Sequence, residues 1–465
     1  YKTMNGGQTW IKTLDLPDQT GIIELSVVPN DFNIMYSAAW EKDRKAWDFK
    51  SSGTNSGIYK STDAGNSWYL ISTSESGFLQ GKGVGRIGLA AFDANTLYAI
   101  VDNQERRPRS DALQAKLNKY DFEGISLEAF MAIDNKLLET FLSDNGFPKG
   151  YTANRIREEV RNGKLKPSDL ALFLYNANDD LFDTPVVGPE VYRSGDGGQT
   201  WCRTHSGYLD DIYYSYGYYF GMVHVSPSDK NHIYIYGVPI LSSKDGGKSF
   251  KTLDAANLHA DHHALWINPK NPKHLVNGND GGVNISYDGG QNWIKANQPT
   301  VGQFYTVYAD EQEPYHVYGG LQDNGVWEAV HTAKESVRWH QSGHNPWTAI
   351  MGGDGMQIQV DSRNANIVYT GYQFGNYFRI DRDADKRKYI QPKHKLGEAP
   401  FRFNWQTPIQ LSAHNDDIIY LGSNKLHRSL NQGDDWKAIS DDLTKGAKKG
   451  NVPYGTLTSI DESRD

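Results

Sequence analysis

Apolar and polar positions alternate in short runs along most of this chain, and turns join the runs in pairs. An apolar run, a turn rich in Pro, Asn and Asp, and a run rich in β-branched residues and Tyr recur in that order at 25–40, 223–238, 265–280 and 409–424. Such alternation between turn signals is typical of half-buried β-strands. The pattern therefore predicts a mainly β chain built from repeated strand–turn–strand units.

A second phrase follows these units and reads Ser/Thr-x-Asp/Asn-x-Gly-x-x-Trp/Phe. Its six copies lie at 3–10, 61–68, 194–201, 243–250, 286–293 and 429–436. The Asp or Asn can bond the backbone of its own turn, the Gly supplies a positive φ, and the aromatic ring fills the gap to the next unit. Each copy predicts a hairpin between the third and fourth strands of a unit. Repetition at this period indicates a propeller or a solenoid.

The six copies resemble the Asp-box, or BNR, repeat shared by sialidases, sortilin-type domains and tandem-propeller xyloglucanases. Four copies fit the motif fully, whereas Asn5 and Asn431 stand where the family usually has Asp. The likeness extends nearly end to end to large secreted bacterial proteins of the sortilin-like or BNR glycosyl hydrolase kind. It implies an all-β propeller fold of four-stranded blades, with portions of two tandem seven-bladed propellers, and a secreted or cell-surface location. Asp boxes brace the scaffold, so the resemblance implies little about chemistry.

The strand pattern also predicts how the chain is organised. It gives eight hairpins of third and fourth strands and eight first strands, the last of these at 455–463. The chain opens on a third strand and closes on a first strand, so we expect neighbouring segments of a longer chain to complete those blades. We expect blades at 1–103 and 187–255 and further blades, of a second propeller, at 256–465, with the boundary near 250–300.

Residues 104–186 break the β pattern and predict a small helical insertion. Apolar residues recur at helical spacing over 126–142, where Ser126 is suited to cap the helix. Two further helices are expected at 152–163, ended by Asn162-Gly163, and at 166–179, capped by Ser168. A helical module on a propeller can serve as a lid, serve as a docking surface or have no function of its own. The sequence does not distinguish these three roles.

Composition narrows the classes of function. The 465 residues carry a net charge of −8, which argues against nucleic acid as a partner. No run of 18 apolar residues is present, so we expect no membrane span. The single cysteine, Cys202, cannot form an internal disulfide, and we expect it to be buried and inert beside Trp201.

The sequence segments that do not belong to the recurring turns fall on one face of the predicted blades. Strand direction alternates within a blade, so the Asp boxes lie on one rim while the second-to-third and fourth-to-first connections open on the opposite face. We therefore look for ligand-binding residues there. The candidate ligand-binding residues are His259, Asp261, His262, His263, Asn279, Gln322, Asn324, Trp405, Tyr216, Tyr219 and Tyr372.

The histidines at 259–263 stand at the start of an innermost strand. Neighbouring residues on a strand point to opposite faces, so we expect only one of His262 and His263 to join Asp261 and His259 at a site. These side chains either bond water and backbone or hold a metal with a further carboxylate. We predict no metal and no cofactor, because neither an HExxH pattern nor a Cys pair is present.

Three acidic residues, Asp280, Asp323 and Asp354, precede Gly or Asn-Gly in successive units. Asp-Gly and Asn-Gly favour tight hairpin turns, which is a sufficient structural reason for each residue taken alone. Two carboxylates roughly 5–9 Å apart could instead act as acid and base, or acid and nucleophile, on a glycosidic bond. The resemblance to propeller glycosidases implies that role for acidic residues on this face. Sialidases also need an arginine cluster, which we do not find.

Two functions remain in view. The first is a binding scaffold that recognises a peptide or a glycan across the loop-rich face. The second is a polysaccharide-active glycoside hydrolase that uses Asp280, Asp323 and Asp354 as its catalytic candidates. Exposed aromatic rings beside amide and acidic side chains suit either ligand. Whether the chain is an enzyme is left undecided by the sequence.

Overall fold

The structure is a computed structural model, and it describes residues 1–107, 116–182, 186–296, 301–334, 336–337 and 346–464. It divides into two compact units. Unit 1 comprises 1–107, 181–301 and 450–452, and unit 2 comprises 108–180, 302–449 and 453–465. The sheet that follows residue 256 packs within unit 1.

Unit 1 holds four of the seven four-stranded sheets found among the described residues. The first sheet contains β1 (Thr20–Val28), β2 (Asp31–Glu41), β5 (Gly57–Ser61) and β6 (Tyr69–Leu70). The second contains β7 (Val84–Ala91), β8 (Leu97–Arg106), β9 (Val186–Ser194) and β10 (Cys202–Arg203). The third contains β11 (Met222–Ser226), β12 (Asp229–Tyr236), β13 (Ile240–Ser243) and β14 (Lys251–Thr252). The fourth contains β15 (His262–Ile267), β16 (Leu275–Asn279), β17 (Gly282–Ser286) and β18 (Ile294–Lys295).

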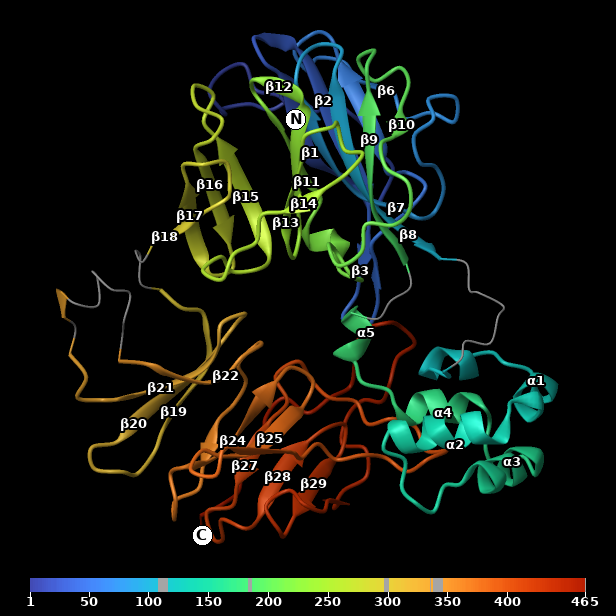
Figure 1. Ribbon diagram of the computed structural model, residues 1–465, viewed down its shortest axis with the longest axis vertical. Coiled ribbons are helices and arrows are strands. Elements are labelled where there is room, and N and C mark those ends of the chain that lie inside the picture. The colour runs from blue at the N-terminus through green and yellow to red at the C-terminus, as the bar shows by residue number, and fades with distance from the viewer. Residues whose placement is uncertain (108–115, 183–185, 297–300, 335, 338–345, 465) are drawn as a thin grey trace. The chain divides into compact units, whose positions relative to one another are not determined.

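Unit 2 holds the other three four-stranded sheets of the described chain, and Figure 1 shows them in the orange to red part of the ribbon. The first contains β19 (Phe304–Ala309), β20 (His316–Leu321), β21 (Gly325–Val330) and β22 (Thr348–Met351). The second contains β23 (Gln359–Val360), β24 (Ile367–Tyr372), β25 (Asn376–Asp381) and β26 (Lys386–Tyr389). The third contains β27 (Ile409–Leu411), β28 (Ile419–Gly422), β29 (Leu426–Ser429) and β30 (Lys437–Ala438).

Consecutive sheets within a unit pack face to face, as the blades of a propeller do. Strand β8 shows why: Leu97, Ala99 and Val101 pack toward the first sheet, while Tyr98 and Ile100 pack toward the third. This period of two buries both faces of a central sheet. A cluster between β12 and β15–β16 joins the third sheet to the fourth, and two clusters join the sheets of unit 2. The chain is thus all-β, with four-stranded antiparallel blades.

The six Asp-box phrases form the same turn. In each phrase, the backbone N–H of the glycine at position 5 donates a hydrogen bond to the hydroxyl at position 1. The backbone N–H at position 7 donates to the side-chain oxygen of the Asp or Asn at position 3. The fourth and fifth residues both have positive φ. The glycine lets the turn approach the preceding blade closely, since a Cβ on Gly198 would lie 2.4 Å from Cδ1 of Ile71. The expected local chemistry of the repeat is confirmed.

The insertion is helical, as expected, and its residues 108–180 belong to unit 2, whereas Leu181 and Phe182 belong to unit 1. Its elements are η1 (Lys119–Phe122), α1 (Leu127–Ala132), α2 (Asn135–Asp144), α3 (Ala153–Arg161), α4 (Ser168–Phe173) and α5 (Asp179–Phe182). Figure 1 shows α1–α4 as one compact group. Their buried apolar side chains form a core of their own. No helix among the described residues is long and apolar enough to cross a membrane.

Some local expectations about the insertion are confirmed and others are corrected. Ser126 caps α1, and Asn162 with Gly163 ends α3. The single helix expected at 126–142 is wrong, because Asp134 accepts the amide of Leu137 and starts a second helix there. Ser168 lies inside α4 as its first residue, and it does not cap that helix.

Two further expectations fail. Residues 455–463 were expected to form the first strand of another blade, but they form no strand. This segment instead contacts the last sheet through hydrogen bonds such as the one that the side-chain amide of Gln410 donates to Asp461. Cys202 is exposed, because it lies on the outer strand β10 and points away from the neighbouring buried Trp201. A small hairpin, β3 (Asp43–Arg44) and β4 (Phe49–Lys50), projects from the second-to-third connection of the first sheet.

Candidate functional site

In the described sheets the third-to-fourth connection, which is an Asp-box turn in five of the seven, lies at one end and the second-to-third connection lies at the other. We call the latter end, together with the connection into the next first strand, the loop edge. The antiparallel registers place the start of β15, the end of β16, the β20–β21 connection and the residues after β22 at this edge. The predicted site residues therefore do lie on the loop edge, some in unit 1 and some in unit 2.

The two neighbouring histidines of β15 point to opposite faces of their sheet. His262 is 1% exposed and its Nδ1 lies 2.8 Å from Oδ1 of Asn277. His263 is partly exposed, and its Nε2 lies 3.3 Å from Oδ1 of Asp280. This hydrogen bond to the carboxylate raises the pKa of His263. His263 and Asp280 thus form an acid–base pair at the loop edge of unit 1, and His262 belongs to the core.

The other predicted residues near this pair hold the loops together. The amide of Asp261 donates to the carbonyl of Val238, and its own carbonyl accepts the amide of Asp280. Asp261 adopts a φ of 60°. Asn279 donates to Asn277 and Asn284 and accepts the amide of Gly281. His259 lies with its Nδ1 2.9 Å from the carbonyl of Ala260.

A tyrosine-rich connection covers this part of unit 1. The ring of Tyr216 packs against Phe182 and Phe220, and Phe220 stacks on His263 with centroids 5.4 Å apart. Tyr219 is 51% exposed and packs against Tyr218. The ring of Phe220 thus covers one face of the His263 imidazole, and Tyr216 extends this aromatic surface.

Sequence reasoning missed two ionisable residues that lie against this tyrosine-rich connection. Asp102 on β8 is fully buried, and Oδ1 of Asp102 has no hydrogen-bond partner among the described residues. Burial raises the pKa of Asp102 to about 7. Arg86 on β7 donates to the carbonyls of Tyr218 and Tyr219. The only signal in the sequence is an Asp at the end of a continuous apolar run, LYAIVD, which reads equally well as the end of the strand.

Unit 2 brings Asp323 and Asp354 together. The carboxylate of Asp354 accepts the amide of Asp323 at 3.0 Å, and Asp323 has a φ of 58°. Tyr305 lies beside both residues, and burial raises the pKa of this tyrosine to about 12. Trp405 donates its indole N–H to the hydroxyl of Tyr305 at 3.2 Å. Asp280 lies in unit 1, so the three predicted carboxylates are divided between the two units.

The amides predicted beside Asp323 shape its turn. Asn324 donates its side-chain N–H to the carbonyl of Gln322, and its own carbonyl accepts the indole N–H of Trp327. The amide of Gln322 donates to the carbonyl of Gln303. Gln322 and Asn324 therefore stabilise the connection between β20 and β21. This structural role explains both residues without a ligand.

The helical insertion meets the loop edge of the second sheet of unit 2. The amide of Gln373 donates to Oδ1 of Asn178 at 2.7 Å, and Asn176 donates to Oδ1 of Asn376 at 2.9 Å. Tyr372 precedes Gln373 and lies against Gly353, whose Cβ position would be 3.3 Å from Cβ of Tyr372. The pairs joined here are about two hundred residues apart in the sequence, so no local pattern could have predicted them.

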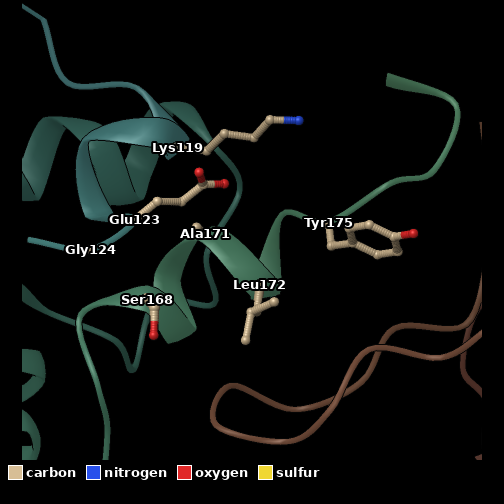
Figure 2. Close-up of a pocket in the computed structure, with 7 residues that line it drawn as sticks. All are labelled: Lys119, Glu123, Gly124, Ser168, Ala171, Leu172 and Tyr175. Carbon is tan, nitrogen blue, oxygen red and sulfur yellow. The ribbon is translucent and has the colours of Figure 1, made fainter. Parts of the chain in front are cut away.

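The insertion also carries a hollow of about 320 Å³ between η1 and α4. Figure 2 shows Lys119 and Glu123 on one side of it and Leu172 and Tyr175 on the other. Leu172 and Tyr175 are each about two-fifths exposed. Ser168 lines this hollow, whereas none of the site residues predicted from the sequence does.

The chemistry available at the loop edge follows from these contacts. Among the residues that the structure describes, no group of three His, Cys, Asp or Glu side chains is arranged to hold a metal ion. The carboxylate of Asp280 faces a histidine, and that of Asp354 accepts a backbone amide. The arrangement can bind hydroxyl, amide and aromatic groups, and His263 is a titratable group whose pKa is raised by its hydrogen bond to Asp280.

Comparison with known proteins gives structural likenesses only. No protein-family model and no curated protein matches the chain. Among solved structures, it is similar to the GH74 xyloglucanase of Xanthomonas campestris, at 11% identity and a TM-score of 0.32, over 93% of this chain and 47% of that one. It is also similar to YCF48 bound to D1 peptide, at 10% identity and a TM-score of 0.30, over 90% of this chain and 96% of that one. The chain thus spans about half the length of the xyloglucanase.

Proposed function

We propose that this chain is a binding protein that recognises a peptide or a glycan through its loop edge. The proposal rests on the contacts that the carboxylates of Asp354 and Asp280 make within the protein. Asp354 accepts the amide of Asp323, and Asp280 pairs with His263. These carboxylates hold loops in place. The ring of Tyr219 is exposed at the loop edge of unit 1. A rigid scaffold with aromatic and amide groups on its loops is what recognition needs.

We further propose that the protein works outside the cell or at its surface. The support is the resemblance of its Asp-box phrases to those of large secreted bacterial proteins. Fractionation of the source cells, with immunodetection of the chain in medium, surface and cytoplasmic fractions, tests this. Detection in the cytoplasmic fraction alone would contradict it.

Binding is tested with the purified chain on two arrays, one of glycans and one of peptides. We expect retention on one of them, and we expect Tyr219→Ala to weaken that retention if unit 1 is used or Trp405→Ala if unit 2 is used. Leu430→Ala serves as a control, because Leu430 is an exposed side chain inside an Asp box and away from the loop edge. Retention on neither array would overturn the proposal.

A glycoside hydrolase is the second candidate, and one observation favours it. Asp323 and Asp354 come from neighbouring connections of unit 2, joined by a hydrogen bond, with the Tyr305 hydroxyl beside them. Two carboxyl-bearing residues in adjoining connections, with a phenol nearby, are the parts an acid–base mechanism uses. Release of reducing ends from a soluble polysaccharide, lost in both Asp323→Asn and Asp354→Asn, would establish this function. Release that persists in both variants would exclude these residues as its catalysts.

A further inference from the structure

We infer that the turn 175–179 of the helical insertion and the connection 372–376 of unit 2 together form a saccharide-binding subsite. The inference rests on the proposed binding function and names the ligand class for one part of it. The two segments belong to the same unit, although the first lies in the insertion and the second in a blade. They are joined by side-chain amides and not by backbone pairing.

Five polar side chains, of which Gln373 and Asn376 are buried, make the rim of this subsite. Gln373 donates to Asn178 at 2.7 Å, and Asn176 donates to Asn376 at 2.9 Å. Tyr389 donates its hydroxyl to the same oxygen of Asn376 at 2.8 Å. Amides and hydroxyls of this kind both donate and accept, which suits the hydroxyl groups of a sugar.

One of these groups lacks the partner that its burial requires. Gln373 is only 8% exposed, and Oε1 of Gln373 has no hydrogen-bond partner among the described residues. A buried acceptor without a donor is unfavourable, so native proteins leave such atoms to a water or to a ligand. Gln373 is held by Asn178 through its Nε2, so its buried oxygen keeps a fixed position beside the insertion and would be satisfied by a donor from a bound molecule.

The backbone of the connection is already engaged, and this favours a sugar over a peptide. The carbonyl of Gln373 accepts from Asn376, and the carbonyl of Phe374 accepts from Gln391. The amide of Phe374 donates to the carbonyl of Trp405. A peptide that adds to an edge needs free backbone groups, whereas a sugar needs side-chain acceptors and an aromatic face.

The aromatic face is present beside the rim. Tyr372 is half-buried and lies against Gly353, next to Asp354. Burial and the nearby charge of Asp179 raise the pKa of Tyr372, so its phenol stays protonated and can donate. Phe374 packs against Trp405 with ring centroids 5.2 Å apart and planes at 80°. Rings next to amides match the apolar faces and hydroxyl rims of a saccharide.

The insertion presents its turn on a firm base. Fifteen buried apolar residues form its core, and Phe173 at the end of α4 packs near His394 of the blade, with centroids 5.9 Å apart. Leu396 of the blade packs against the same core. The turn after Tyr175 is thus fixed relative to Gln373, as a recognition subsite requires.

The test compares Gln373→Met and Tyr372→Leu with the unaltered chain. Gln291→Met is the matched control, because Gln291 is an exposed glutamine in an Asp-box turn of unit 1. Affinity electrophoresis is run in gels containing xyloglucan, laminarin or arabinoxylan, and thermal unfolding is recorded for every variant. We expect at least one polysaccharide to retard the unaltered chain. Gln373→Met and Tyr372→Leu should each weaken its binding about tenfold, and Gln291→Met should leave it unchanged.

The outcomes separate this inference from the function on which it rests. If folded Gln373→Met and Tyr372→Leu bind a polysaccharide as tightly as the unaltered chain, Gln373 holds a water alone and the subsite is wrong, while glycan binding stands. If no polysaccharide binds but a peptide does, the subsite is wrong and the scaffold function stands. If neither class binds, both fail.

Discussion

Nε2 of His263 lies 3.3 Å from Oδ1 of Asp280, at the point where β15 begins and β16 has just ended. Phe220 stacks on the far side of the imidazole. The neighbouring His262 turns the other way, into the core. One residue of a histidine pair is thus exposed to a ligand and the other supports the sheet.

The pKa of His263 is a direct test of this pair. Because Asp280 raises it, Asp280→Asn should lower the pKa of His263 toward or below its ordinary value. By linkage, the stabilisation from the pair is fully present below the unfolded pKa and is lost as the pH rises through the folded one. NMR titration of the ring protons measures the shift. Asp229→Asn, on the opposite edge, is the control, and an unchanged His263 in Asp280→Asn would contradict the contact.

Asp102 should make the folded chain less stable as the pH rises. Burial raises its folded pKa to about 7, above the unfolded value, so the folded state holds a proton that the unfolded state releases. Its contribution is fully present below about pH 4 and is lost by about pH 7, a change on the order of 2–4 kcal/mol. Asp102→Asn should remove that dependence between pH 4 and pH 8.

Denaturant unfolding of both proteins across this pH range measures the effect. A parallel pH profile in Asp102→Asn would show that Asp102 titrates normally. Asparagine keeps the carbonyl oxygen that accepts from Gln104, so loss of that hydrogen bond does not complicate the comparison.

The Asp-box glycine that faces the preceding blade should tolerate no side chain. A Cβ on Gly198 would lie 2.4 Å from Ile71, and its φ is +91°. Gly198→Ala should therefore destabilise the chain by about 1–3 kcal/mol. Gly195→Ala in the same turn is the control, because its Cβ position has nothing within 4 Å. Equal melting temperatures for the two variants would contradict the close approach.

Cys202 should react in the folded chain. It lies exposed on β10, so a water-soluble disulfide reagent should titrate one thiol per chain without denaturant. Cys202→Ser should abolish the signal. A thiol that reacts only after unfolding would show that the strand is covered in solution.

The repeat turns were predictable because their determinants are local. Ser194, Asp196 and Gly198 lie within five residues, and each supplies its part of the turn through bonds inside the phrase. The alternation of apolar residues along β8 likewise indicates a strand buried on both faces. The break of the expected 126–142 helix at Asp134 was harder to see, because an Asp in a helical pattern can either continue the helix or cap a new one.

Local patterns in the sequence were enough to predict the blades, their Asp-box turns and the edge on which the unusual residues lie. The contacts of Asp280 with His263, of Asp323 with Asp354 and of Gln373 with Asn178 of the insertion became visible only in the folded chain. The difference comes from the range of the interactions. A turn is specified by hydrogen bonds between near neighbours, whereas a binding site gathers side chains from segments whose separation along the chain carries no pattern.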